Sequence, residues 1–522
     1  ALPFSVGEVQ ILHPLTDLCY GYATWIAGNK PDDQRVLKTD FCLLDKHGKV
    51  LVRIKDFISK PLYQESKPHP AKGSSSREVG LHSMLPVWVP LHKTREQEVL
   101  VSESSRILLL GKDQDHLNWV RKSYANTTLL PIPITSSMAA IEATLQANTF
   151  DQLLWISPDV SIVSGNINEG EVDMIGEQEQ GVLTVFRMIK ALLQSGYGNK
   201  VLHWTFITGT TQPVRIDDQI QATHAGVVGL VGSLSKEFPH WHIRLLDVDS
   251  LSLLTAHECM SRERDKQGDG LAYRQGEWFR PGLSPLLSLP PAAPVYKQRG
   301  VYIVIGGAGG LGEVWSRFMI ENYQASIVWI GRRQCDAGIQ DKINELSQVG
   351  EAPVYISADA TKFDDLARAY KKIQETYSTI HGVVHSAIVL QDQSLAQMDE
   401  SRFRSSLSAK VDISVNMEKV FGSEALDFML FFSSFISFFK SPGQSNYAAG
   451  CTFKDSFAHS LARRHRYPVK IMNWGYWGNV GIVTDEFYNK RMEQMGIGSI
   501  EPQEGMLTLQ ALVDSGINQL GL

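Results

Sequence analysis

The stretch Val301-Tyr302-Ile303-Val304-Ile305-Gly306-Gly307-Ala308-Gly309-Gly310-Leu311-Gly312 decides the fold class of this 522-residue chain. Its apolar beginning predicts a buried strand, and the glycines predict a tight turn that opens a helix. A second strand is expected over Ser326–Ile330. Strand, turn, helix and strand form one unit of a parallel α/β sheet. Backbone N–H groups in such a turn can approach a phosphate closely, because no side chains block them.

The residues after the second strand indicate which nucleotide this unit binds. Arg332 and Arg333 stand where an NAD site usually has an acidic residue for the ribose hydroxyls, and arginine suits the 2′-phosphate of NADP. We therefore predict an NADPH site. The alternative is a structural turn with a solvated basic pair. The candidate cofactor-binding residues are Gly306, Gly307, Gly309, Gly310, Leu311, Gly312, Arg332, Arg333, Asp359, Ala360, Ser386 and Ala387. Asp359 follows a strand expected over Val354–Ala358, where it either borders the adenine or belongs to a helix N-cap region.

An earlier part of the chain repeats the alternation of strands and helices. Strands are expected over Arg106–Leu110, Leu153–Ile156, Leu202–Ile207 and His242–Val248, and helices over Val182–Leu193 and Ala222–Phe238. The turn after the first of these strands, Leu109-Leu110-Gly111-Lys112, has no glycine cluster, so we expect this unit to be structural. The predicted fold class is α/β, with two Rossmann-like, doubly wound parallel-sheet subdomains, plus a small N-terminal β segment. The first subdomain is truncated and structural, and the second is catalytic.

Composition shifts give the expected domain boundaries. Residues 1–62 form the β segment, in which Asp45–Gly48 make a turn and Val50, Val52 and Ile54 lie on the apolar face of a strand. Residues 63–84, rich in proline, glycine and serine, form a linker. The structural subdomain spans 85–294, up to a segment at Ser284–Pro294 rich in proline and leucine. The catalytic subdomain spans 295–522.

Composition and charge exclude several function classes. The chain is 43% hydrophobic and 20% charged with a net charge of −6, so nothing favours nucleic acid as a partner. No apolar run reaches the roughly 18 residues of a membrane span. The five cysteines lack metal-ligand spacing, so we expect free thiols in the cytoplasm and no metal site. The chain does not begin with Met, and we expect an excised piece of a longer protein.

Three side chains fit the chemistry of carbonyl reduction, which needs a hydride, a proton donor and a group that polarises the carbonyl. Ser434 ends an apolar strand, Tyr447 begins a helix thirteen residues later, and Lys410 lies on an earlier helical stretch. A phenol with its ordinary pKa of about 10 holds its proton too tightly at neutral pH, so a nearby cation is expected to lower that pKa. The bland alternative is that these are ordinary residues at strand and helix ends.

Six motifs follow one another along the chain in an order that resembles the ketoreductases of modular polyketide synthases. They are the glycine turn, Gly331-Arg332-Arg333, His385-Ser386-Ala387, Ser434, Pro442-Gly443-Gln444-Ser445-Asn446-Tyr447 and Asn473-Trp474-Gly475-Tyr476-Trp477. These enzymes are a branch of the short-chain dehydrogenases, and the resemblance is to the trans-acyltransferase type. It implies that Tyr447 donates the proton, Ser434 binds the carbonyl and Lys410 supplies the cation. It also implies NADPH as cofactor and, as partners, other domains of the synthase and an acyl carrier protein bearing a ketoacyl chain on phosphopantetheine.

The resemblance also assigns stereocontrol. Leu390-Gln391-Asp392 matches the Leu-Asp-Asp signature of B-type members except in its middle residue, and Phe439 stands where A-type members have Trp. A B-type, D-hydroxyl product is therefore expected. The candidate substrate residues are Leu390, Asp392, Phe439, Gln444, Trp474 and Trp477. The two tryptophans either line the pocket or simply pack, with the pocket preferred. His385 is expected to be a satisfied strand-end histidine.

Two departures from the family pattern leave an alternative open. Cys451 replaces the usual Asn four residues after the Tyr, and Ile388 replaces a Gly near the nicotinamide. The alternative is a catalytically impaired scaffold of the same fold. A free-standing short-chain dehydrogenase is disfavoured by the extra subdomain. Residues 1–62 resemble the last strands of a dehydratase hotdog domain without its catalytic motifs, so no dehydratase activity is expected.

Overall fold

The structure is a computed structural model that describes residues 2–16, 18–25, 37–60, 80–91, 101–130, 138–160, 172–265, 268–289, 292–478, 480, 492 and 496–522. The chain forms two compact units, Ala1–Gly80 with Arg215–Asp218, and Leu81–Val214 with Gln219–Leu522. Each unit is described by itself. The greater part of the predicted linker lies outside the described residues.

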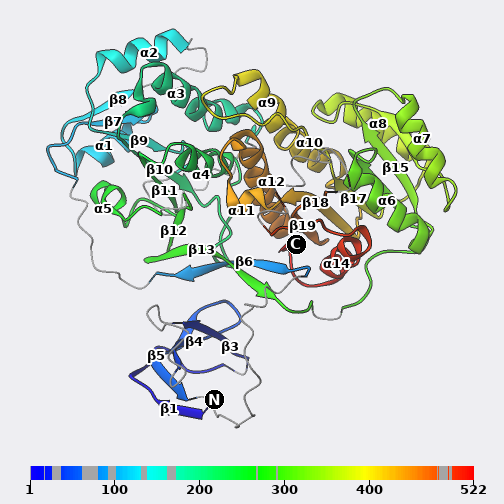
Figure 1. The fold of residues 1–522 in the computed structure, drawn as a ribbon, viewed down its shortest axis with the longest axis horizontal. Helices are drawn as coiled ribbons and strands as arrows, with labels where there is room; N and C mark the ends of the chain where they lie inside the picture. Colours follow the sequence, from blue (N-terminus) through cyan, green and yellow to red (C-terminus); the bar gives the residue numbers. More distant parts are fainter. Residues whose placement is uncertain are drawn as a thin grey trace, which may run out of the picture. The chain divides into compact units, whose positions relative to one another are not determined.

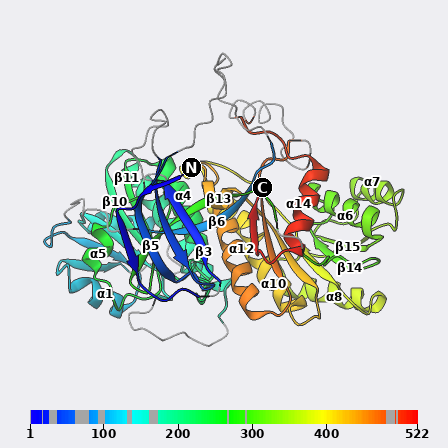
Figure 2. The ribbon, with the colours of Figure 1, turned by 90° about the horizontal axis from the view of Figure 1, so that it is seen from below.

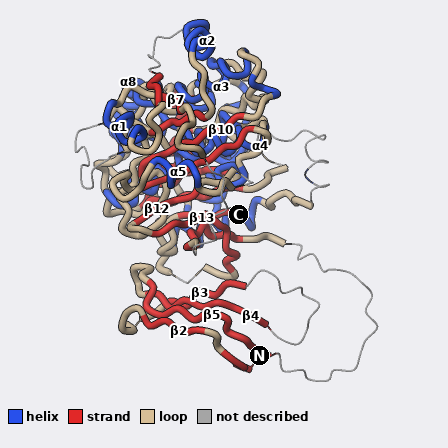
Figure 3. The backbone as a smooth tube through the Cα atoms, turned by 90° about the vertical axis from the view of Figure 1, so that its left-hand side faces the viewer, coloured by secondary structure: helices blue, strands red, loops and turns tan. Residues whose placement is uncertain are grey.

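The smaller unit holds an antiparallel sheet, drawn as red strands in Figure 3. Its strands are β1 (Leu2–Ser5), β2 (Glu8–Ile11), β3 (Tyr20–Trp25), β4 (Leu37–Leu44) and β5 (Val50–Lys60), in the order β1-β5-β4-β3, with β2 also paired to β5. The predicted turn is confirmed, since Gly48 has φ +82° and donates its N–H to the Asp45 carbonyl (3.0 Å). The predicted apolar face is partly wrong. Leu51, placed on the polar face, is as buried as Val52.

The larger unit is built on one sheet of fifteen strands, in the order β16-β15-β14-β17-β18-β19-β20-β6-β13-β12-β11-β10-β9-β7-β8. We call residues 101–289 the first half and residues 292–522 the second half (Figures 1 and 2). Strands of the first half are β7 (Ile107–Leu110), β8 (Thr127–Leu130), β9 (Gln152–Ile156), β10 (Leu202–Gly209), β11 (Trp241–Val248), β12 (Leu271–Arg274) and β13 (Glu277–Leu286). Strands of the second half are β14 (Val301–Ile305), β15 (Ser326–Gly331), β16 (Val354–Ser357), β17 (Gly382–His385), β18 (Phe428–Ser434), β19 (Val469–Trp474) and β20 (Gln519–Gly521).

The α/β fold class is confirmed, and the predicted strands are found with their ends shifted by up to two residues. In the second half the parallel order places β14 between β15 and β17, which is the switch point where such sheets bind ligands. In the first half, β8 is the edge strand of the sheet among the described residues. The segment Ser284–Pro294 is not wholly a boundary, because β13 continues to Leu286 and pairs with β6 (Ser83–Pro90).

Helices cover both faces of this sheet. The first half has α1 (Gln114–Arg121), α2 (Met138–Ala147), α3 (Val182–Gln194), α4 (Gly226–Glu237) and α5 (Ala256–Ser261). The second half has α6 (Gly310–Tyr323), α7 (Ala337–Leu346), α8 (Phe363–Thr376), α9 (Glu400–Ser408), α10 (Val411–Phe421), α11 (Ile436–Phe439), α12 (Ser445–Arg464) and α14 (Pro502–Asp514). One apolar core runs through both halves and includes side chains of α3, α4, α10 and α12. The two halves therefore share a core as well as a sheet. None of the described helices is long and apolar enough to cross a membrane.

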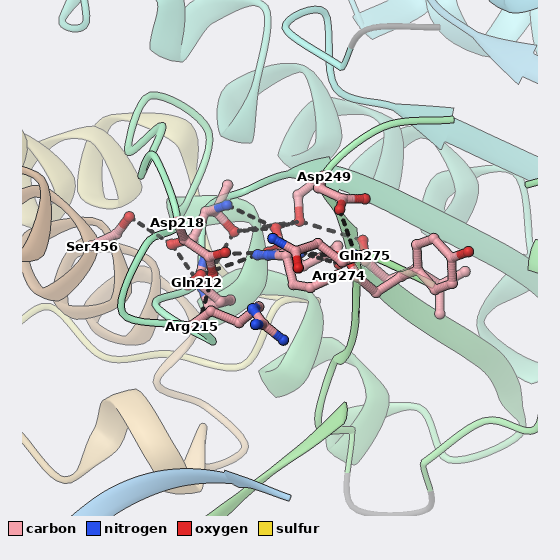
Figure 4. A network of polar contacts seen from close by, with 12 residues as sticks. Gln212, Arg215, Asp218, Asp249, Arg274, Gln275 and Ser456 are labelled. Atoms are coloured by element: carbon pink, nitrogen blue, oxygen red, sulfur yellow. Dashed lines mark hydrogen bonds and ion pairs between the residues drawn. The ribbon is translucent and has the colours of Figure 1, made fainter. Parts of the chain in front are cut away.

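A buried polar network joins the first half to α12 (Figure 4). The guanidinium of Arg274 bonds the carboxylate of Asp247 and donates to the Gln212 carbonyl (3.1 Å). The same carboxylate accepts from the N–H (2.9 Å) and hydroxyl (2.7 Å) of Thr211. Ser456, on α12, donates its hydroxyl to the Thr211 carbonyl (2.7 Å). Because a buried charge is stable only when it is paired and hydrogen-bonded, this network fixes the Thr211–Gln212 turn against α12.

Candidate active site

The glycine turn after β14 has the backbone that only glycine allows. Gly306 has φ +85°, and a Cβ there would lie 2.7 Å from the Ala387 Cα at the end of the neighbouring strand β17. A Cβ on Gly312 would lie 2.7 Å from the Gly306 carbonyl oxygen. At Gly309, in contrast, a Cβ would meet nothing closer than that same oxygen at 3.2 Å. The turn is packed on its protein side and open at Gly309.

Gly309 is also the N-cap of α6, and no side chain caps this helix. The first N–H groups of α6 are therefore left for a ligand, which is the arrangement that binds a pyrophosphate. The corresponding helix of the first half, α1, is capped differently. Its N-cap Asp113 accepts from the N–H groups of Asp115 (2.7 Å) and His116 (3.2 Å). A carboxylate thus takes the place that a phosphate would need, so only the second half fits a dinucleotide.

The basic pair follows β15 as predicted. Both arginines are exposed, and Arg333 forms an ion pair with Asp336 (3.0 Å). Arg332 has no ion-pair or hydrogen-bond partner among the described residues, so its guanidinium is available for an anion at this edge. Asp359 lies three residues before Lys362, the N-cap position of α8, and so belongs to the region that leads into this helix. Its carboxylate accepts from the N–H (3.1 Å) and hydroxyl (2.7 Å) of Thr361 in that turn.

The three predicted catalytic side chains converge beside this turn. Ser434 ends β18, and Tyr447 lies in the first turn of α12. Lys410 is the N-cap of α10 and 2% exposed, and its Nζ donates to the Ala387 carbonyl (3.2 Å). That nitrogen lies 5.3 Å from the centroid of the Tyr447 ring. Because Ala387 also contacts Gly306, one backbone residue links the lysine to the nucleotide turn.

The electrostatics of Tyr447 differ from the expectation. Burial raises the pKa of the phenol well above its usual range, the nearby Cys451 raises it further, and the hydrogen bond with Ser434 lowers it. The net direction is therefore upward, although the cation of Lys410 stands over the ring. A raised pKa keeps the phenol protonated, which is the state that a proton donor needs before reaction.

Comparison with known proteins decides the family. Residues 300–479 match the family described as "KR domain". Over its whole length the chain is 42% identical to polyketide synthase PksN of Bacillus subtilis (strain 168), of which it covers 9%. Over 99% of its length it is 39% identical to polyketide synthase PksM of the same strain, of which it covers 12%. The chain contains a ketoreductase domain of the polyketide synthase family. It spans only about a tenth of the length of these two relatives.

Solved structures agree on the fold. An N-terminal ketoreductase from the macrolactin assembly line superposes with a TM-score of 0.68 at 17% identity, covering 84% of this chain and 91% of that one. A ketoreductase domain from the bacillaene assembly line gives a TM-score of 0.65 at 18% identity, covering 84% and 96%. At these identities the likeness concerns the fold alone. Ketoreductases are oxidoreductases that use a nicotinamide cofactor, which agrees with the open glycine turn.

A buried lysine beneath the ketoreductase site was missed by the sequence reasoning. Lys454 is 0% exposed, and its Nζ lies 3.0 Å from the Phe432 carbonyl oxygen and 3.2 Å from Nδ1 of His385. Burial, then the positive charge of Lys410, lower the pKa of Lys454 well below its usual value. Cys451, also fully buried, lies between Tyr447 and Lys454 on α12. The spacing 447, 451, 454 puts all three on one helix face, and this is the signal that could have revealed the lysine.

His385 was expected to have its ring nitrogens hydrogen-bonded, and this holds for only one of them. It ends β17 and is fully buried, and burial followed by the charge of Lys454 lowers its pKa well below the usual value. Its Nε2 has no hydrogen-bond partner among the described residues. The imidazole is therefore neutral, with one nitrogen bonded and one not.

The predicted substrate residues fall into two groups. Gln444 and Asp392 come together, with Gln444 Nε2 donating to Asp392 Oδ2 (2.8 Å), and Leu390 lies half-buried two residues earlier. Trp474 and Trp477 are 3% and 6% exposed and pack edge-to-face in the core against each other. Both indoles belong to the core that also contains Met506 and Leu509 of α14, and their pocket role stays a prediction.

Phe439 lies apart from the three catalytic candidates. It is 54% exposed and lines a cavity of about 320 Å³ together with Trp88 and Leu283, and none of Ser434, Tyr447 and Lys410 lines that cavity. The reason is the short helix α11, which ends at Phe439 and carries this ring to a face shared with β6 and β13. Its ring stacks on Phe435 (5.3 Å between centroids).

Proposed function

We propose that this chain is an NADPH-dependent ketoreductase that reduces a ketoacyl thioester, carried on the phosphopantetheine of an acyl carrier protein, to the hydroxyacyl thioester. The observation that carries the proposal is the convergence of Ser434, Tyr447 and Lys410 beside an open glycine turn. Among the described residues no group of His, Cys, Asp and Glu could hold a metal ion.

The residues divide the work as follows. The glycine turn and the first N–H groups of α6 would hold the nicotinamide cofactor, which would supply the hydride for the carbonyl carbon. The hydroxyl of Ser434 donates a hydrogen bond to the carbonyl oxygen and holds it near Tyr447 Oη. As negative charge develops on that oxygen, the phenol proton of Tyr447 moves onto it, and the ammonium of Lys410 stabilises the phenolate left behind.

The choice of NADPH rests on Arg332. Its exposed guanidinium, without a partner among the described residues, suits a 2′-phosphate better than two ribose hydroxyls. The proposed product is the D-hydroxyl of B-type reduction, because Asp392 is retained and Phe439 replaces the A-type tryptophan. Residues 1–62 are proposed to be a dehydratase-like remnant without activity, followed by a linker that ends before β6.

The test is reduction of a β-ketoacyl thioester with NADPH, followed by chiral analysis of the hydroxy product, with NADH in a parallel reaction. We expect NADPH oxidation with one dominant product, the D-hydroxyacyl thioester. Absence of any reduction of β- and α-ketoacyl thioesters, with the cofactor still binding, would favour the scaffold alternative. An L product would overturn the B-type assignment while leaving the reductase in place.

A further inference from the structure

The last residue of α4 reaches across the larger unit to the segment that precedes Tyr447. Helix α4, from the first half, packs directly on α12: a Cβ on Gly229 would collide with the backbone carbonyl of Ala448. The hydroxyl of Thr452 donates to the Ala225 carbonyl (3.1 Å). This close backbone approach brings Glu237, at the C-terminal end of α4, beside the turn that leads into α12.

Each oxygen of the half-buried Glu237 carboxylate accepts from one backbone N–H group. Oε1 accepts from the Gly443 N–H (2.9 Å), and Oε2 accepts from the Leu395 N–H (2.7 Å). Burial raises the pKa of Glu237, while the two N–H bonds lower it. A buried carboxylate is costly unless it is hydrogen-bonded, so the bonds to these two segments hold the charge in place.

Both segments carry candidate stereocontrol residues. Gly443 precedes Gln444, and Leu395 follows Asp392 by three residues. Gln444 Nε2 donates to Asp392 Oδ2 (2.8 Å), so the two segments are joined at a second point. The first half also holds the Leu395 segment from its other side, because Lys190 Nζ donates to the carbonyls of Leu395 (2.9 Å) and Ala396 (2.7 Å).

We propose that Glu237 is a positioning residue for stereocontrol. It belongs to the first half, for which no chemistry is proposed, and it sets the distance between the Asp392 segment and the Gln444 segment. This inference rests on the proposed reductase function. The Asp392 carboxylate is near enough to Tyr447 to raise its pKa, and Gln444 precedes Tyr447 by three residues. On this proposal, the separation of the two segments determines which face of the ketone can turn toward the hydride. A change of about 1.4 kcal/mol between the two orientations alters a product ratio tenfold.

The decisive variant is Glu237→Gln. An amide has one oxygen and one NH₂ group, so one of the two backbone N–H groups loses its acceptor and faces a donor instead. We expect the ratio of the two hydroxy isomers to fall about tenfold, whichever isomer the wild-type chain favours. We also expect amide hydrogen exchange of the segments around Leu395 and Gly443 to speed up by about tenfold, a readout that needs neither substrate nor turnover.

Glu179→Gln is the matched control. The carboxylate of Glu179 also joins the two halves, through Arg187 (2.9 Å) and Arg404, but contacts neither segment. It should lower the melting temperature without changing the isomer ratio or the exchange of those two segments. If Glu237→Gln does not fold, Lys190→Met loosens the Leu395 segment from its carbonyl side and should also reduce the ratio.

The outcomes separate the inference from the function. The role of Glu237 is overturned if the wild-type chain reduces the substrate and Glu237→Gln gives the same isomer ratio. The same holds for an unchanged ratio in Lys190→Met, where that variant is used. Either result leaves the reductase function intact. A wild-type chain that binds the cofactor and reduces no ketoacyl thioester removes the function and the stereocontrol role together. In that case faster exchange in Glu237→Gln shows only that the two segments are held there.

Discussion

The two halves of the larger unit begin in the same way and differ at one position. In each, a buried strand leads into a helix, through β7 and α1 in the first half and β14 and α6 in the second. The N-cap of α1 is Asp113, whose carboxylate fills the helix N-terminus, and the N-cap of α6 is Gly309, which leaves it open. The same topology thus gives a helix capped by its own carboxylate in one half and a helix N-terminus open to an anion in the other. What a Rossmann-like unit can bind is decided by the residue at this cap.

The largest expected effect removes the chemistry of the second half. Tyr447→Phe deletes the proton donor, and kcat should fall by about 10²- to 10⁴-fold with the affinity for NADPH unchanged. The matched change in the first half is Tyr124→Phe, at a fully buried phenol bonded to His257 (3.1 Å). This variant should keep kcat. Steady-state kinetics and cofactor titration check both, and equal losses in the two variants would contradict the division of labour.

The next effect concerns cofactor choice. Arg332→Ala should raise KM for NADPH about ten- to a hundredfold and leave KM for NADH unchanged, because only the 2′-phosphate loses a charged partner. Arg333→Ala is the control and should have a smaller effect, since Arg333 is already paired with Asp336 (3.0 Å). If Arg332→Ala raised KM for NADPH and KM for NADH by the same factor, the arginine would stabilise the turn rather than recognise the phosphate.

The lowered pKa of Lys454 predicts that the free energy of unfolding depends on pH. Unfolded, it titrates at its ordinary value of 10.5, whereas in the fold burial and the charge of Lys410 lower its pKa. The unfolded chain therefore binds the additional proton, and the penalty on folding is lost as pH rises toward 10.5. The other titratable neighbours are Cys451, Asp455 and His385.

The test compares urea unfolding of wild type and Lys454→Met between pH 8 and pH 10. The variant should be the more stable at pH 8, with its advantage shrinking by up to about 1.4 kcal/mol per pH unit as pH rises. Lys371→Met, at an exposed lysine of α8, should show no such trend. A difference between wild type and Lys454→Met that stays constant with pH would mean that this lysine is charged in the fold.

The smallest effect lies in the first half. Asp113→Ala removes the cap of α1 and should lower the free energy of unfolding by about 1 kcal/mol, without change in kcat or in affinity for NADPH. Denaturant unfolding and cofactor titration measure the two quantities. A clear loss of cofactor affinity in this variant would mean that the first half contributes to the nucleotide site.

Local patterns in the sequence were enough to predict most of this arrangement. Strand periodicity and the glycine cluster placed β14 and α6, and Lys410 and Tyr447 lie together as expected, while their catalytic roles stay a proposal. What local pattern could not supply was contact between distant segments. Glu237 contacts Gly443 and Leu395 only because α4 packs on α12. Trp474 and Trp477 are a second example, because the packing of their indoles depends on α14, a helix formed later in the chain.

The most direct measurement is to give α6 the N-cap residue of α1 and to titrate the variant with NADPH. Gly309→Asp places the carboxylate of the first half at the N-terminus of α6, where the backbone is extended (φ −80°, ψ 163°) and the nearest atom to a Cβ is 3.2 Å away. We expect calorimetry to show one NADPH per wild-type chain, and at least about a hundredfold weaker binding in Gly309→Asp with its melting temperature retained. Undiminished binding in that variant would contradict this expectation.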